Sequence, residues 1–213
     1  MIVPDYSRET ALYRRGLARI AGVDEVGRGP WAGPVTAAAV VLDPGAIPQG
    51  LRDSKTLSPK RREALAEAIL ATSDVSVVHV SVEDIDRLNI LQASHLAMRL
   101  AIAGLTCPPD HALIDGNRLP DDLPCPGGTI VRGDALSLSI AAASIVAKVG
   151  RDRLMVDLAQ QHPDYGWATN MGYGTAEHRL GLERHGVSPH HRRSFKPIHN
   201  ILWQEKNRHQ TGI

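Results

Sequence analysis

Acidic residues recur in this chain where predicted strands end. They are Asp24, Glu25, Asp115 and Asp134. Because the C-terminal ends of neighbouring parallel strands meet at one edge of a sheet, we expect these side chains to converge. Converging carboxylates repel one another unless a divalent cation lies among them. Carboxylate ligands select hard cations, so the pattern indicates a site for Mg²⁺ or Mn²⁺, and two such ions can promote phosphodiester hydrolysis.

The first acidic pair is followed by chain with little side-chain bulk, namely Gly27, Gly29, Pro30, Gly33 and Pro34. Carboxylates next to a segment with so few bulky side chains suggest a metal site that a polyanion can approach. Successive residues of a strand point to opposite faces. The two acids can therefore share a site only if the strand has begun to turn, or if the second contributes its backbone carbonyl. The sequence leaves both possibilities open for Glu25.

The elements that position these acids are a strand hairpin followed by alternating strands and helices. Apolar and β-branched runs predict the strands, and apolar spacing with capping residues predicts the helices. The expected strands are 20–23, 35–42, 75–82, 111–115 and 129–132, and the expected helices are 59–71, a short one from Ser81, 90–103, 136–159 and 175–185. Beyond Pro163 the sequence becomes rich in glycine, histidine and arginine, and Pro189 and Pro197 are expected to interrupt it.

Composition is ordinary for a globular domain, with 43% hydrophobic and 22% charged residues in 213. The net charge of +1 provides no global basic field, so any nucleic-acid affinity must come from local patches. Cys107 and Cys125 make no disulfide framework, which favours a reducing compartment. Without an apolar run of about 20 residues, we expect a soluble, cytoplasmic protein that does not enter a membrane.

Several separate stretches resemble, in the same order, the motifs of ribonuclease HII, the bacterial type 2 ribonuclease H. They are Val23–Pro34, Asp53-Ser54-Lys55 with Leu57, Ile114-Asp115-Gly116, Gly133-Asp134, Ala141–Lys148 with Arg151-Asp152-Arg153, and Gly172-Tyr173-Gly174-Thr175. The resemblance extends from about Ile20 to Pro197. About 19 residues precede the first predicted strand, which favours type 2 over the type 3 enzymes with their extra N-terminal domain.

The resemblance implies a ribonuclease H-like α/β fold, a mixed five-stranded sheet flanked by helices. It also implies a catalytic domain at 1–160 and a C-terminal helical appendage at 161–213 that contributes a substrate tyrosine. The implied enzyme is a two-metal endonuclease that uses Mn²⁺ or Mg²⁺. It cuts 5′ of a ribonucleotide in RNA–DNA hybrids or at single ribonucleotides in duplex DNA, as in ribonucleotide excision repair, and leaves 3′-hydroxyl and 5′-phosphate ends. We expect it to act as a monomer.

The same resemblance implies roles for individual residues. The catalytic and metal-binding positions are Asp24, Glu25, Asp115 and Asp134, and the substrate-binding positions are Gly27, Arg28, Gly29, Arg52, Ser54, Lys55 and Tyr173. A glycine-flanked loop can bring backbone groups to a 2′-hydroxyl, the group that distinguishes RNA from DNA. Basic residues before a helix suit phosphate contacts.

Other features have weaker interpretations. The basic stretch His190-His191-Arg192-Arg193 with Lys196 is expected to face nucleic acid. Lys148 is expected to be structural or at the surface. His178 and His185 are expected at the surface despite their spacing on one helix. The tail after Pro197, with Trp203, contains no motif that indicates a role.

Two alternative functions remain open at this point. The run Gly27–Ala32 satisfies G-x-G-x-x-A, with Asp53 farther along, as in dinucleotide-binding enzymes. Pro34 and the acidic pair before the glycines argue against that function. A non-catalytic nucleic-acid-binding module would need basic patches but gives no reason for carboxylates at three strand ends.

Overall fold

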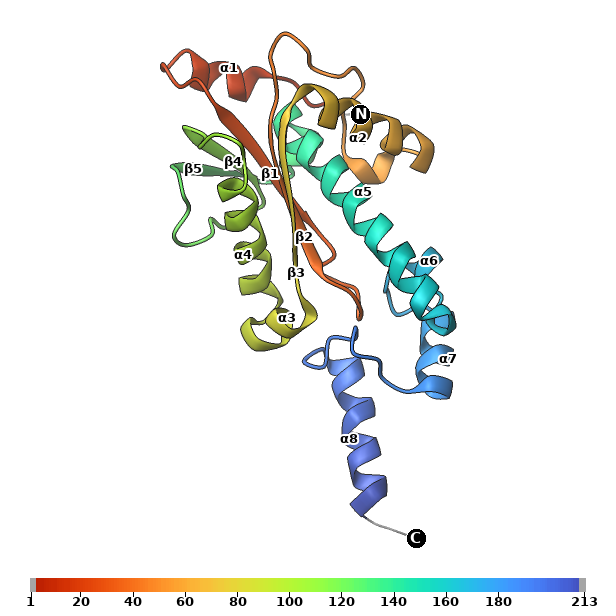
Figure 1. Ribbon diagram of the computed structural model, residues 1–213. Coiled ribbons are helices and arrows are strands. Elements are labelled where there is room, and N and C mark those ends of the chain that lie inside the picture. The colour runs from red at the N-terminus through yellow and green to blue at the C-terminus, as the bar shows by residue number, and fades with distance from the viewer. Residues whose placement is uncertain (1–2, 211–213) are drawn as a thin grey trace. The chain divides into compact units, whose positions relative to one another are not determined.

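The computed structural model describes residues 3–210 and contains a mixed sheet of five strands in the order β3-β2-β1-β4-β5 (Figure 1). Their bounds are β1 Ile20–Val26, β2 Val35–Val41, β3 Asp74–Val80, β4 His111–Asp115 and β5 Gly127–Ile130. The mixed five-stranded sheet expected from the sequence is confirmed.

Strand direction explains how acids distant in sequence reach one edge. β1 pairs antiparallel with β2, with Asp24 opposite Ala38. On its other side β1 runs parallel to β4, and β4 runs parallel to β5. The C-terminal ends of β1, β4 and β5 therefore share one edge of the sheet, as the repeated strand-end acids predicted.

The helices are α1 Ser7–Tyr13, α2 Pro59–Thr72, α3 Val82–Leu88, α4 Ile90–Ala103, α5 Leu138–Gln161, α6 Trp167–Asn170, α7 Ala176–His185 and α8 Lys196–Gln210. Short 3₁₀ turns occupy Ser54–Thr56, Gly133–Ala135 and Pro163–Tyr165. Ser58, Ser81 and Thr175 cap the helices that follow them by accepting a backbone N–H. These side-chain caps explain why the predicted starts of α2, α3 and α7 are correct.

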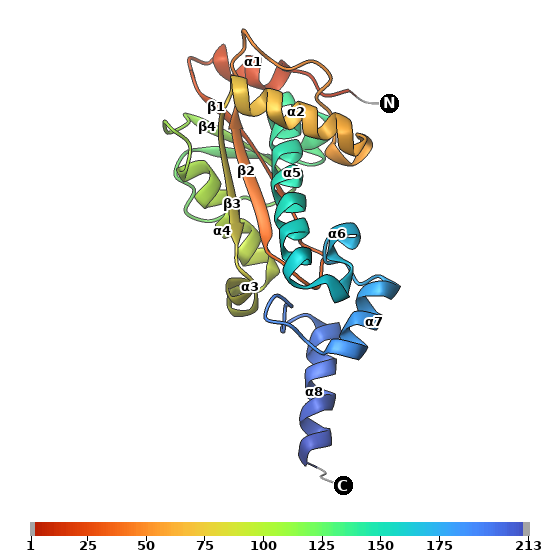
Figure 2. The same cartoon turned by 45° about the vertical axis from the view of Figure 1, so that its right-hand side comes forward.

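The alanines of α5 allow it to lie very close to the sheet. A Cβ added to Gly22 would lie 2.0 Å from the carbonyl carbon of Ser139, so only glycine fits there on β1. Ala141, Ala142 and Ala143 are fully buried in a cluster with side chains of β2 and α2. Figures 1 and 2 show α2 and α5 on one side of the sheet and α4 on the other. The sheet is thus covered by helices on both sides.

Several predicted boundaries were wrong. β5 ends at Ile130, so Asp134 lies in the following 3₁₀ turn rather than directly after a strand. β3 ends at Val80, because Ser81 caps α3 and makes Val82 helical. Pro197 does not interrupt the C-terminal segment but lies in the first turn of α8, where a missing N–H costs nothing. Helix α1 was not predicted, because its seven residues are too few to show a clear apolar period.

The chain forms two compact units. The first comprises 3–26, 36–79 and 94–150 of the described residues, and the second comprises 27–35, 80–93 and 151–210. The second unit therefore combines the C-terminal segment with two segments from before residue 160. The functional division into 1–160 and 161–213 remains a prediction.

Aromatic packing holds the second unit together. Trp167 is fully buried and stacks on Tyr165 with ring centroids 4.9 Å apart. Their cluster includes Met155, Leu182 and Ile198 from three different helices. This core fixes α8 to the rest of its unit through Ile198.

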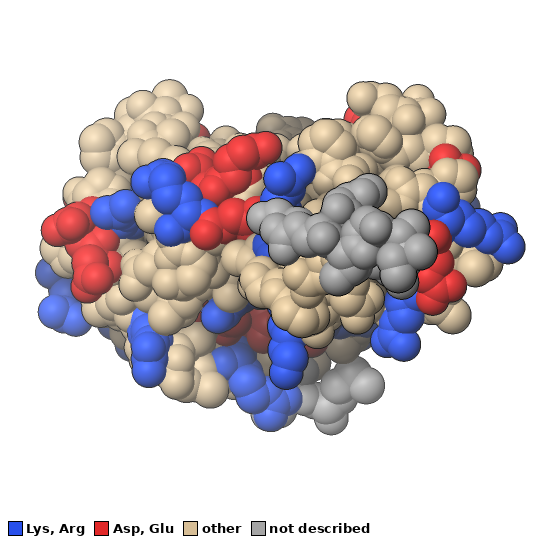
Figure 3. All heavy atoms as spheres, turned by 90° about the horizontal axis from the view of Figure 1, so that it is seen from below, with Lys and Arg blue, Asp and Glu red and all other residues tan. Residues whose placement is uncertain are grey.

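The surface agrees with the near-zero net charge. On the face seen in Figure 3, basic and acidic side chains are interspersed rather than segregated by sign. Within residues 3–210, none of the helices is both long enough and apolar enough to cross a membrane.

Candidate active site

The acidic residues of the first unit come from β1, β4 and the turn after β5. Asp24 is buried on β1, with 7% of its surface exposed, and its carboxylate accepts the N–H of Glu25 at 2.7 Å. Asp115 ends β4 and accepts the N–H of Gly133 at 2.6 Å. That bond connects the end of β4 to the turn that carries Asp134. Strand pairing brings β1 beside β4, and the Asp115 carboxylate joins β4 to the turn that follows β5.

The carboxylates are close enough to raise one another's pKa. Burial, followed by the charges of Glu25 and Asp115, raises the pKa of Asp24 well above its usual value. Burial, followed by the charges of Asp53 and Asp115, likewise raises the pKa of Asp134, while Lys55 opposes that shift. Such mutual repulsion is the electrostatic signature of a site that a cation would stabilise.

The donor set suits a hard divalent cation, because every predicted ligand offers carboxylate oxygen. Within residues 3–210, however, no group of three or more His, Cys, Asp or Glu side chains already has the geometry to hold a metal ion. The carboxylates are thus electrostatically coupled without forming a closed set of ligands. Metal binding by Asp24, Glu25, Asp115 and Asp134 remains a prediction.

A buried pair of hydroxyl groups supports Asp24. Ser144 of α5 hydrogen-bonds to the Asp24 carboxylate, which lowers the pKa of that carboxyl against the effects of burial. The Ser144 hydroxyl also lies 2.9 Å from that of Ser54, and both serines are buried. Ser54 thus contacts Ser144, the residue that hydrogen-bonds to Asp24, and its predicted contact with substrate remains a prediction. Sequence reasoning missed Ser144, although a hydroxyl within an alanine-rich helix could have drawn attention to it.

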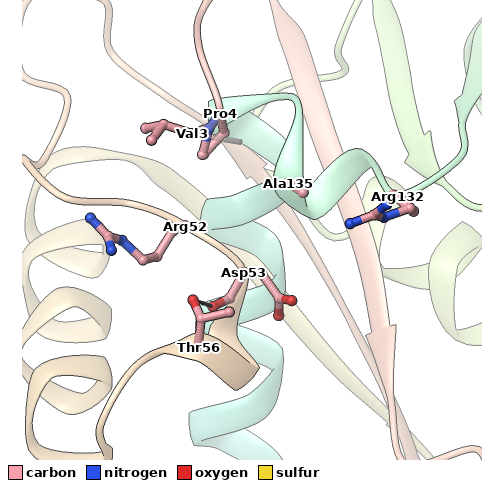
Figure 4. Close-up of a pocket in the computed structure, with 7 residues that line it drawn as sticks. All are labelled: Val3, Pro4, Arg52, Asp53, Thr56, Arg132 and Ala135. Carbon is pink, nitrogen blue, oxygen red and sulfur yellow. Dashed lines mark hydrogen bonds between the residues drawn. The ribbon is translucent and has the colours of Figure 1, made fainter. Parts of the chain in front are cut away.

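A pocket in the first unit is lined by Ala135, the residue that follows Asp134 (Figure 4). Asp53, which raises the pKa of Asp134, lines it together with Arg52 and Arg132. Arg52, a predicted substrate contact, points away from Asp53 in Figure 4 and is exposed. Lys55 is exposed on the 3₁₀ turn after Asp53. Sequence reasoning missed Arg132, whose backbone is left-handed at φ 58°.

In the second unit, the Gly27-Arg28-Gly29 loop lies against Tyr173. A Cβ added to Gly29 would lie 3.4 Å from the Tyr173 ring, which is 48% exposed. Gly27 has φ +89°, and a Cβ there would lie 2.2 Å from Nε of Arg151. Arg28 and Gly29 are exposed. The structure therefore brings the predicted loop and the predicted tyrosine together, and only glycine fits at position 27.

This loop is not the start of a helix. Residues 27–34 connect β1 to the antiparallel strand β2. A dinucleotide fingerprint requires a helix directly after the strand and a βαβ unit. The dinucleotide-binding alternative is therefore excluded.

The prediction that the basic stretch faces nucleic acid was wrong for His191 and Arg192, both of which are fully buried. Arg192 donates to backbone carbonyls, and His191 lies 2.9 Å from His178 between their Nε2 atoms. His178 was expected at the surface, yet it too is fully buried and accepts the indole N–H of Trp167. The sequence around His178 and His191 is rich in glycine and histidine and lacks an apolar period, so it did not predict that these residues lie in a core. Lys148, expected to be structural or at the surface, is half-buried.

Comparisons with known proteins agree with this geometry. The family model described as Ribonuclease HII matches residues 21–198. A protein from Cereibacter sphaeroides named ribonuclease HII is 68% identical over 202 residues, which cover 95% of each chain. One from Paracoccus denitrificans is 64% identical over 203 residues, covering 95% of this chain and 97% of its own.

A solved structure shows the same fold. The crystal structure of the ribonuclease H2 from Pyrococcus horikoshii superposes with a TM-score of 0.74 at 26% identity. The match covers 89% of this chain and 99% of that one. A family match over most of the length, together with this fold, assigns the class of enzyme, a hydrolase that acts on RNA–DNA hybrids. The chain belongs to the ribonuclease HII family of endonucleases.

Proposed function

We propose that this enzyme cleaves the phosphodiester on the 5′ side of a ribonucleotide, both in RNA–DNA hybrids and at single ribonucleotides embedded in duplex DNA. The products are a 3′-hydroxyl on the upstream strand and a 5′-phosphate on the ribonucleotide. The observation that supports this most directly is the coupling of Asp24 to Glu25 and Asp115, because three carboxylates within range of one another have little use except around a cation.

Asp24, Glu25, Asp115 and Asp134 would hold the divalent cation, Mg²⁺ or Mn²⁺, which polarises the phosphate and activates water when bound. The residues themselves must be ionised to do this. Ser144 favours the ionised form of Asp24 by its hydrogen bond, and Lys55 does the same for Asp134 by its charge. The mutual repulsion that raises the pKa values of Asp24 and Asp134 would be relieved by a bound cation.

In this proposal, residues of the second unit recognise the ribonucleotide. Arg28 and Gly29 are exposed on this loop, and their backbone groups would suit hydrogen bonding to a 2′-hydroxyl. Tyr173, beside Gly29, offers an aromatic face to the sugar of the next nucleotide. A deoxyribose presents an apolar C2′ edge to that ring, whereas a ribose would have to desolvate its hydroxyl.

The experiment that tests this function uses a labelled DNA duplex with one ribonucleotide, the same duplex without it, and a continuous RNA–DNA hybrid. We expect cleavage only of the two ribonucleotide-containing substrates, only with Mg²⁺ or Mn²⁺, and none with EDTA. The upstream product should be extended by a DNA polymerase, which requires a 3′-hydroxyl. Cleavage that ignores the ribonucleotide, or that leaves a cyclic phosphate, would refute the proposal. Binding without any cleavage would instead favour the non-catalytic module.

A further inference from the structure

The side chain of Arg192 is fully buried in the second unit and is directed at the loop that precedes β2. Its Nη2 donates to the carbonyl of Gly27 at 2.6 Å, and its Nη1 donates to the carbonyl of Arg28 at 3.0 Å. The same guanidinium donates to Gly33 through Nε and to Pro34 through Nη2. One side chain thus binds four carbonyls of a single loop, and two of them belong to the Gly27-Arg28-Gly29 segment.

Because the peptide unit is planar, these contacts with the carbonyls also fix the direction of the N–H groups in the same peptide units. The described residues contain no cis peptide, so the C=O of each residue and the N–H of the next point in opposite directions. Because the carbonyls of Gly27 and Arg28 point at the guanidinium, the N–H groups of Arg28 and Gly29 point away from it. Both of these residues are exposed. Arg192 therefore directs two N–H groups of the loop away from its own buried guanidinium, and Gly29 lies next to the Tyr173 ring.

The buried guanidinium of Arg192 remains charged at neutral pH. Burial, with a further contribution from the nearby charge of Arg151, lowers the pKa of Arg192 to about 9, which still leaves it protonated at neutral pH. A buried guanidinium costs free energy unless its donors are satisfied. Four carbonyls supply that compensation, and its planar fork matches them in a way that a lysine ammonium does not.

We propose that Arg192 is a positioning residue for ribonucleotide specificity: it fixes the peptide planes of the Gly27-Arg28-Gly29 loop so that the N–H groups of Arg28 and Gly29 can bind the 2′-hydroxyl. The inference rests on the proposed function of that loop. It gives Arg192 a role that contact with nucleic acid could not, since its side chain is buried.

Arg151 provides a matched control. It is equally buried, at 1% exposed, and it too lies against Gly27, but the carbonyls to which it donates are those of Pro34, Ala32 and Met171. Arg192→Lys and Arg151→Lys should therefore both lower the melting temperature. Only Arg192→Lys should release the two peptide planes that face the ribonucleotide.

The test measures affinity by fluorescence anisotropy, in Ca²⁺ and at fixed salt, for a duplex with one ribonucleotide and for the same duplex in all-DNA form. Arg192→Lys should reduce the preference for the ribonucleotide about tenfold, the effect of weakening two hydrogen bonds, and leave all-DNA binding within about twofold. Arg151→Lys should retain the preference. Equal loss in both variants, or an unchanged preference in Arg192→Lys, would overturn the inference.

Two further outcomes are informative. If the wild-type enzyme shows no preference for the ribonucleotide, the proposed function of the loop fails, not merely the role of Arg192. If Arg192→Lys does not fold, Arg192→Gln, whose planar amide still donates hydrogen bonds, replaces it in the same anisotropy comparison. An unchanged preference for the ribonucleotide in Arg192→Gln would likewise overturn the inference.

Discussion

The hydroxyl groups of Ser54 and Ser144 lie 2.9 Å apart although the residues are 90 positions apart in the sequence. Ser144 also binds the carboxylate of Asp24. The 3₁₀ turn that contains Ser54 is thus connected through α5 to the most buried acid of the candidate site. A hydroxyl pair of this kind can favour the ionised carboxylate without adding a charge.

Ser144→Ala should therefore raise the pKa of Asp24 further. Because Asp24 acts in its ionised form, the acid limb of the pH profile of kcat/KM should move to higher pH. The pH profile measured with a ribonucleotide-containing duplex in Mg²⁺ tests this. Ser54→Ala leaves the hydrogen bond from Ser144 to Asp24 in place, so it should move the acid limb of the profile less. An acid limb that stays in place in Ser144→Ala would show that this hydroxyl does not tune Asp24.

Asp24→Asn should reduce cleavage below detection, because an amide keeps the volume of the side chain but removes the charge that attracts the cation. The same change removes repulsion with Glu25 and Asp115, so the metal-free protein should melt at a higher temperature. Gel assays in Mg²⁺ and thermal denaturation in EDTA measure the two effects. Cleavage at the wild-type rate would remove Asp24 from the site.

Asp134→Asn should lower kcat by about 10²-fold or more, a loss of several kcal/mol of transition-state stabilisation. Affinity for the duplex should change less than kcat, because Asp134 is expected to bind the cation rather than a phosphate. Single-turnover rates and anisotropy titrations separate the two quantities. Normal cleavage combined with weak binding would show that Asp134 is not catalytic.

Tyr173→Ala should lower cleavage at a single embedded ribonucleotide more than cleavage of a continuous hybrid. The ring is 48% exposed beside Gly29, and losing an aromatic contact with a sugar or base costs about 1–3 kcal/mol. The measurement is the ratio of kcat/KM on the two substrates at fixed salt. Equal losses on both, with an unchanged melting temperature, would mean that Tyr173 does not recognise the junction.

The buried histidines of the second unit should make the fold sensitive to acid. Burial and the neighbouring His178 lower the pKa of His191 to about 3, and burial also lowers that of His178. The unfolded chain, with a histidine pKa near 6.5, binds more protons than the folded one between these values. Stability is therefore complete above pH 6.5 and is lost on acidification, by up to about 1.4 kcal/mol per pH unit for each histidine.

Melting curves from pH 7.5 to 5 measure this loss. His191→Gln should flatten the slope even if it lowers the melting temperature at pH 7.5. His199→Gln, on the exposed face of α8, should leave the slope unchanged. A wild-type melting temperature that does not fall across this range would contradict the assignment.

The sequence by itself determined the sheet, most helices and the candidate acids. Strand periodicity, helix caps such as Ser58, and acids at strand ends are local signals, and each depends on residues close together in the chain. The same was true of the glycine loop at Gly27, because only glycine tolerates that backbone. A family resemblance then implied roles that spacing alone left open.

Only the tertiary structure decided which polar residues are buried. Ser54, His191 and Arg192 are polar residues in sequence typical of surface loops. Inside the protein, however, their hydrogen bonds are satisfied by partners far away in sequence, such as Ser144 and the carbonyl of Gly27. Such pairing follows from packing and not from local pattern. The contacts that hold Asp24 and the Gly27 loop could therefore not be predicted from the sequence, because a polar group is buried favourably only when its distant partner is in place.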